Sequence, residues 1–267
     1  MIFVDMTQFE WHEGEQPLDR LVTDGGMCGI FRTIACIGDS LASGEMESID
    51  ENGKTQYHDL FEYSWGQFMA REAGMTVYNF SRGGMTAREY MESFAEHQNF
   101  FDPKKAAQAY IVALGCNDFF WARYEIGSAE DICKEDPTKN KKTYMGYMGQ
   151  ILSRYKEISP DAKFFLVTLP HGNRWNEEDE ARARHQGELM YELAKMFDNC
   201  YVIDLNRYGP AYDAEFRRRF YMGGHMNAMG YRFTAKLMLS YIDWYIRRFP
   251  ENFREVGLIG TPWKHQK

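Results

Sequence analysis

Short apolar runs alternate with longer amphipathic stretches from residue 31 onward, and this alternation restricts the fold more than any other feature of the chain. The runs have the length of strands, and the stretches between them have the length and periodicity of helices. Strands that alternate with helices build a parallel sheet with helices on both faces. We therefore predict an α/β fold with three layers (α/β/α), flavodoxin-like, around a five-stranded parallel sheet. The predicted strands are residues 33–37, 76–80, 109–114, 163–169 and 201–205.

The turn after the first predicted strand reads Gly-Asp-Ser-Leu and nominates Ser40 as a nucleophile. A serine hydroxyl is a weak nucleophile, so an enzyme that uses one needs a base, usually histidine, and donors for the oxyanion. Three further blocks at or near strand ends contain such groups. They are residues 79–86 (Asn-Phe-Ser-Arg-Gly-Gly-Met-Thr), 115–118 (Gly-Cys-Asn-Asp) and 223–227 (Gly-Gly-His-Met-Asn). Ligands bind beyond the carboxyl ends of parallel strands, so these loops are expected to converge on one crevice.

In order and residue type, the four blocks resemble the SGNH hydrolases, also called the GDSL esterase/lipase family. The resemblance spans residues 31–239. It implies that Ser40 is the nucleophile and His225 the general base. It also implies an oxyanion hole made by the backbone N–H groups of Ser40 and Gly84 and by the side-chain amide of Asn117. Such a mechanism requires no metal and no organic cofactor.

Each block taken alone has a simpler explanation. Gly, Asp and Ser all favour turns, Gly83 is an alternative donor to Gly84, and His225 could be a loop histidine beside a helix cap. The full constellation favours the catalytic interpretation, since such sites are recognised by all their parts together. An α/β-hydrolase is disfavoured because position 42 is Ala, so no Gly-x-Ser-x-Gly elbow surrounds Ser40. Cys116 is interpreted as a small apolar residue rather than a second nucleophile.

The chain departs from the family at the acid of the triad. Family members usually carry Asp three residues before the histidine, where its carboxylate orients the imidazole. Here that position is Met222. Either a backbone carbonyl orients His225 and the site is a Ser–His dyad, or a carboxylate comes from elsewhere, with Asp204 and Asp213 as candidates. A third alternative is a ligand-binding pseudoenzyme that lacks efficient catalysis.

Further residues are predicted to support the site or to bind substrate. Asp39 and Asp118 adjoin Ser40 and Asn117, and we expect them to form turns and hold their neighbours in place. Loops after the strands also carry aromatic and amide side chains that could line a sugar or acyl pocket. A hydrophobic cluster beneath long loops explains them equally well. The substrate-binding candidates are Trp121, Asn173 and Trp175.

Composition excludes several classes of partner. The net charge of -8 argues against a nucleic acid or an anionic membrane surface as partner. The five cysteines are odd in number and form no Cys-x-x-Cys pair, so they predict neither a disulfide framework nor a zinc site. No segment has the pattern of a signal peptide or the length of an apolar membrane span. We therefore expect a cytoplasmic protein without membrane insertion.

The motif order predicts one catalytic domain over residues 30–267, because a boundary between Ser40 and His225 would divide the site. Residues 1–29, polar and aromatic without periodicity, are expected to form an N-terminal extension packed on that domain. The predicted function is a serine-dependent ester hydrolase that acts through an acyl-enzyme on a small-molecule ester, with acetylated carbohydrate favoured. Acyl transfer to a sugar or alcohol is the alternative reaction. The sequence does not determine the acyl chain of the substrate, its alcohol or the oligomeric state of the protein.

Overall fold

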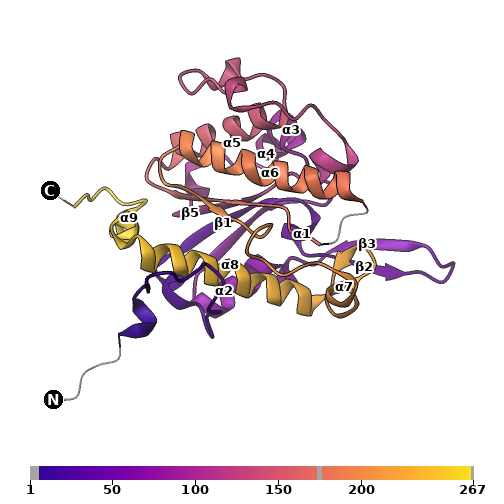
Figure 1. Ribbon diagram of the computed structural model, residues 1–267. Coiled ribbons are helices and arrows are strands. Elements are labelled where there is room, and N and C mark those ends of the chain that lie inside the picture. Colours follow the sequence, from indigo (N-terminus) through magenta and orange to yellow (C-terminus); the bar gives the residue numbers. More distant parts are fainter. Residues whose placement is uncertain (1–5, 173–175, 266–267) are drawn as a thin grey trace.

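A five-stranded parallel sheet forms the centre of the computed structural model, which describes residues 6–172 and 176–265 (Figure 1). The strand order is β4-β1-β5-β6-β7, and all neighbouring strands run parallel. Each predicted strand lies within two residues of an observed one, and the predicted α/β/α fold is confirmed. The strands are β1 Thr33–Gly38, β4 Thr76–Ser81, β5 Ala109–Ala113, β6 Lys163–Val167 and β7 Cys200–Ile203.

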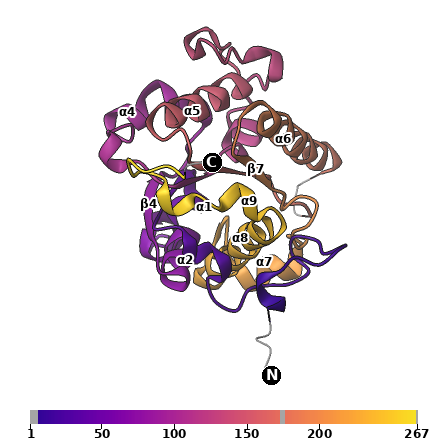
Figure 2. The same cartoon turned by 90° about the vertical axis from the view of Figure 1, so that its left-hand side faces the viewer.

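Helices cover both faces of this sheet (Figures 1 and 2). On one face lie α2 (Trp65–Ala73) and α8 (Ala228–Arg248). On the other lie α5 (Tyr144–Ile158), α6 (Glu177–Met196) and a continuous segment that runs from α3 to α4 through a π-helical turn. None of the helices in the described part of the chain is long and apolar enough to cross a membrane. The shorter helices are α1 Ser40–Ser43, α3 Ala87–Glu89, α4 Ala95–His97, α7 Ala214–Phe220 and α9 Pro250–Phe253.

The sheet is buried on both sides because successive side chains of a strand point to opposite faces. In β1, Ala35 and Ile37 belong to the hydrophobic core under α5 and α6. Ile34 and Cys36 belong to the core under α2 and α8. All four side chains are fully buried, which explains why β1 is a continuous apolar run rather than an alternating one.

Two small antiparallel pairs stand outside the main sheet. The hairpin of β2 (Glu45–Ile49) and β3 (Thr55–Asp59) follows α1 and projects beyond the body of the protein (Figure 1). The second pair, β8 (Tyr221–Met222) and β9 (His225–Met226), lies against β2. The apolar pattern did not predict the hairpin of β2 and β3. This hairpin sets the geometry of the site described below.

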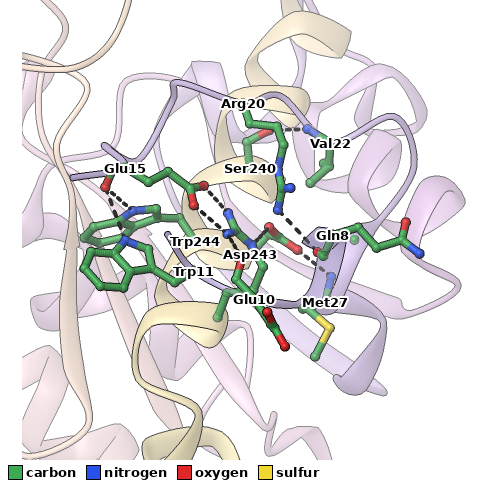
Figure 3. Close-up of polar contacts among 12 residues, drawn as sticks. Gln8, Glu10, Trp11, Glu15, Arg20, Val22, Met27, Ser240, Asp243 and Trp244 are labelled. Carbon is green, nitrogen blue, oxygen red and sulfur yellow. Dashed lines mark hydrogen bonds and ion pairs between the residues drawn. The ribbon is translucent and has the colours of Figure 1, made fainter. Parts of the chain in front are cut away.

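The N-terminal segment lies along α8 and contacts it through polar groups (Figure 3). Arg247, whose side chain is 1% exposed, forms ion pairs with Glu15 and Asp243. The indole of Trp244 donates to the Glu15 carbonyl oxygen at 3.0 Å, and the Met27 N–H donates to Asp243 at 2.8 Å. Arg247 accordingly lowers the pKa of Glu15. The division of the chain at residue 30 stays a prediction.

Candidate active site

Ser40 and His225 form a hydrogen-bonded pair at the carboxyl edge of the sheet. Asp39 follows β1 and caps α1 by accepting the Leu41 N–H at 3.0 Å, which places Ser40 at the first position of that helix. His225 begins β9, and its Nε2 lies 2.9 Å from the Ser40 Oγ. This is the distance that a general base needs in order to take the serine proton.

The other nitrogen of His225 contacts a carboxylate that the sequence analysis did not name. Glu47 on β2 places Oε1 2.7 Å from the His225 Nδ1, and the Gly224 N–H donates to the same oxygen at 2.9 Å. Glycine leaves room for this carboxylate, since a Cβ at Gly223 would overlap with Oε2 of Glu47. The contacts join Ser40, His225 and Glu47 in the order of a catalytic triad.

Asp204 and Asp213, the candidates from sequence, have other partners. The Asp204 carboxylate accepts the Tyr191 hydroxyl at 2.9 Å, the Thr168 hydroxyl at 3.1 Å and the Arg207 N–H at 2.9 Å. Asp213 caps α7 by accepting the Phe216 N–H at 2.9 Å. Neither bonds to His225. Asp204 stands at the end of the last predicted strand and Asp213 in the loop that follows it, whereas the carboxylate at Nδ1 comes from a hairpin 178 residues away.

The predicted oxyanion residues lie beside Ser40. Gly84 has a φ of 72°, which favours glycine. Asn117 begins a π-helical turn, Asn117–Trp121, and its side-chain amide donates to the Met85 carbonyl oxygen at 3.0 Å. That bond fixes the amide next to Gly84 and uses only one of its two N–H groups. Ser40, Gly84, Asn117 and His225 line one pocket.

Asp118 and Asp39 stabilise these loops by hydrogen bonds to backbone N–H groups. Asp118 is fully buried and accepts the Ala87 N–H with both oxygens, at 3.1 and 3.3 Å, so it ties the third block to the second. Burial raises the pKa of Asp118 to about 7. Burial likewise raises the pKa of Asp39 to about 6. Through these hydrogen bonds both side chains hold neighbouring backbone in place.

The pocket has a volume of about 570 Å³ and aromatic walls. Trp121 lines it with 68% of its surface exposed. Tyr57, on β3, lines it too and packs its ring edgewise against His225 with centroids 5.6 Å apart. Asn173 and Trp175, the other predicted substrate-binding residues, lie outside the described residues. Cys116 also lines this pocket.

A second carboxylate of β2 faces His225. Glu45 places Oε1 3.0 Å from Nε2, the nitrogen that also contacts Ser40. Its side chain is 14% exposed, and burial raises its pKa, with the Asp59 and Glu47 carboxylates acting in the same direction. Among the residues that the structure describes, no group of His, Cys, Asp and Glu side chains is arranged to hold a metal ion.

A model of the GDSL-like lipase/acylhydrolase family matches residues 36–233. No curated protein matches the sequence. A protein from Lactobacillus plantarum has a similar structure, with a TM-score of 0.59 at 16% identity over 80% of this chain and 97% of that one. An acetyl xylan esterase has a TM-score of 0.51 at 19% identity, with 79% and 99% covered.

A carbohydrate esterase of family 2 from Corynascus thermopiles, solved with its carbohydrate binding domain, has a TM-score of 0.55 at 16% identity. The match covers 79% of this chain and 65% of that one. At these identities the structural likenesses establish the fold alone.

Proposed function

Because the chain belongs to the GDSL-like lipase/acylhydrolase family, whose members hydrolyse ester bonds, we propose that it is a serine esterase that forms an acyl-enzyme on Ser40. The observation that carries this proposal is the hydrogen-bonded series from the Ser40 Oγ through both nitrogens of His225 to Glu47. A turn that merely contained a serine would need no such series.

The contacts support the following mechanism. The Ser40 Oγ attacks the ester carbonyl carbon while the His225 Nε2 takes its proton. Glu47 accepts the Nδ1–H and stabilises the imidazolium that forms. The Ser40 and Gly84 N–H groups and the Asn117 amide donate to the oxyanion. The imidazolium protonates the leaving alcohol. Water then enters, gives a proton to Nε2 and attacks the acyl carbon. The bond from that carbon to the Ser40 Oγ breaks, the acid leaves, and Nε2 returns its proton to the Oγ.

Glu47 favours a triad over the two alternatives that Met222 had suggested. A dyad would have a backbone carbonyl at the His225 Nδ1, whereas a carboxylate oxygen lies 2.7 Å from it. A pseudoenzyme would tolerate larger side chains at positions 223 and 224, because no carboxylate would need the space that Gly223 and Gly224 leave. We therefore propose that Glu47 replaces the aspartate that the family usually carries three residues before the histidine.

For the substrate we propose a small acetylated molecule, with acetylated carbohydrate favoured. The exposed ring of Trp121 and the ring of Tyr57 offer flat apolar walls of the kind that stack on sugar rings. The fold is shared with a carbohydrate esterase of family 2 and with an acetyl xylan esterase. Transfer of the acyl group to an alcohol would use the same residues, and product analysis with an added acceptor alcohol separates transfer from hydrolysis.

The test is the release of p-nitrophenol from p-nitrophenyl acetate by the wild-type protein and by Ser40→Ala. We expect hydrolysis to fall by at least about 10³-fold in the variant, because removal of the nucleophile leaves only oxyanion stabilisation and binding. A fluorophosphonate probe should label the wild type and not the variant. Equal rates for the two proteins, with no labelling, would refute a serine esterase.

A further inference from the structure

Glu45 is the charged group of the pocket that the mechanism above does not use. It stands two residues before Glu47 on β2, and residues two apart on a strand point to the same face. Both carboxylates therefore face His225, Glu47 at Nδ1 and Glu45 at Nε2, 2.7 and 3.0 Å away. One strand thus brings a carboxylate to each nitrogen of the catalytic imidazole.

The position of Glu45 places it on the alcohol side of the ester. Nε2 delivers its proton to the leaving alcohol oxygen, so that oxygen must come within hydrogen-bond distance of Nε2. The Glu45 Oε1 is itself 3.0 Å from Nε2. A group attached to the carbon beside the ester oxygen would consequently lie next to the Glu45 carboxylate. Gly83 leaves the room for this side chain, since a Cβ there would overlap with Oε2 of Glu45.

This carboxylate has few partners within the protein. Among the described residues, His225 is the one polar partner of the Glu45 side chain, which is 14% exposed. A carboxylate has about four acceptor positions, and a buried acceptor that stays unsatisfied costs free energy. While Nε2 exchanges its proton with the alcohol, Glu45 is therefore left to accept hydrogen bonds from the substrate.

The charges around the pocket determine which sign of charge the alcohol can carry. Asp39, Glu45 and Glu47 all line it, and no Lys or Arg is among its described lining residues. Of the arginines in the segment before His225, Arg217 donates to the Gly223 carbonyl oxygen at 3.1 Å, and Arg218 and Arg219 pair with Glu215. Such a pocket disfavours an anionic alcohol by like-charge repulsion, which a partly buried site screens poorly.

We propose that Glu45 is a specificity-determining residue that selects the alcohol part of the ester. Its carboxylate accepts a hydrogen bond from a hydroxyl on the carbon adjacent to the one that bears the ester oxygen, and it repels alcohols that carry a negative charge. The substrate class is then an uncharged polyol, such as a sugar, that is acetylated beside a free hydroxyl. The inference rests on the proposed function, because Ser40 and His225 define where the alcohol lies.

The test compares three acetyl esters that differ only in the alcohol: ethyl acetate, 2-hydroxyethyl acetate and acetoxyacetate, which is anionic. Each is measured as kcat/KM at the pH plateau of each protein. For the wild type we expect 2-hydroxyethyl acetate to exceed ethyl acetate by about 10-fold to 100-fold, the size expected for a hydrogen bond to a charged group. Acetoxyacetate should be the poorest substrate.

Two variants of Glu45 separate the hydrogen bond from the charge. Glu45→Ala should bring the two neutral esters to within about 3-fold of each other, and it should raise acetoxyacetate relative to ethyl acetate by about 10-fold. Glu45→Gln keeps an acceptor oxygen and the size of the side chain. It should retain part of the preference for the hydroxyl and lose the discrimination against the anion. Glu51→Gln, an exposed charge in the turn of the same hairpin, should keep the wild-type ratios.

One result would overturn the proposal: ratios of kcat/KM among the three esters that stay the same in the wild type and in both Glu45 variants. If the variants then lost activity by one common factor on all three esters, Glu45 would only support His225. Failure of the proposed function is recognised separately, because p-nitrophenyl acetate hydrolysis and fluorophosphonate labelling would then be absent from the wild type as well.

Discussion

The role proposed for Glu47 rests on geometry, because its position in the sequence points elsewhere. Ser40 and His225 could be predicted from the sequence because each stands in a recognisable block beside glycines. No comparable block surrounds Glu47. The order of residues along the chain gave no reason to connect a glutamate that follows the first strand with a histidine 178 residues later. That connection requires the three-dimensional path of the hairpin.

The role of Glu47 predicts a large effect on turnover. In Glu47→Gln the amide can present N–H to Nδ1, which favours the wrong imidazole tautomer and removes the charge that stabilises the imidazolium. We expect kcat to fall by roughly 10³-fold to 10⁴-fold with little change in KM, measured with p-nitrophenyl acetate. Glu51→Gln, on the same hairpin, is the matched control and should keep full activity. A decrease in kcat below about 10-fold would favour a Ser–His dyad.

The β2–β3 hairpin escaped prediction for a physical reason. The five sheet strands are apolar because they are buried on both faces, but in the hairpin Glu45, Met46 and Glu47 are half-buried and the remaining positions are mostly exposed. Its signal lies instead in Asn52-Gly53, a pair that favours hairpin turns, between two strand-length segments. In the structure Gly53 has a φ of 78° and completes the turn.

The contact between this hairpin and the turn of β8 and β9 can be tested with two glycines. Gly223 and Gly53 have nearly equal φ values, 77° and 78°. A Cβ at Gly223 would overlap with the Glu47 carboxylate, whereas a Cβ at Gly53 meets nothing within 4 Å. Both alanine variants should lose about 1 kcal/mol of unfolding free energy from backbone strain.

Only Gly223→Ala should lose activity, by about 10-fold or more in kcat, because it displaces Glu47 from the His225 Nδ1. Urea unfolding and p-nitrophenyl acetate hydrolysis measure the two effects. Equal activity in the two variants would mean that the turn does not position the carboxylate.

At the scale of the whole molecule, the apolar pattern was sufficient to predict the parallel sheet and the edge at which the site lies. Ser40, Gly84 and Asn117 follow three strands that are adjacent in the sheet, in the order β4-β1-β5. The rule that ligands bind beyond the carboxyl ends of such strands therefore brought them together correctly. It could not place residues of the hairpin, which lies outside the sheet, and this is why the pocket walls and both glutamates depended on the structure.

The buried carboxyl of Asp118 couples the protonation of this site to the stability of the whole fold. Burial raises its pKa to about 7, whereas an unfolded aspartate titrates near 3.9. Between these two values the folded protein holds a proton that the unfolded chain has released. The free energy of unfolding therefore decreases as the pH rises from about 4 to about 7, and the decrease due to Asp118 reaches about 4 kcal/mol. Above pH 7 both states are ionised and this contribution is constant.

Asp118→Asn should remove that part of the pH dependence, because an amide does not titrate while its oxygen can still accept the Ala87 N–H. Urea unfolding at pH values from 4 to 8 should show a smaller decrease in unfolding free energy for the variant than for the wild type. Asp39, with a pKa of about 6, contributes a remaining decrease in both proteins. Asp198→Asn, at an exposed position, should follow the wild type. Parallel curves for Asp118→Asn and the wild type would mean that the pKa of Asp118 does not differ between the folded and the unfolded protein, and that its protonation is not coupled to stability.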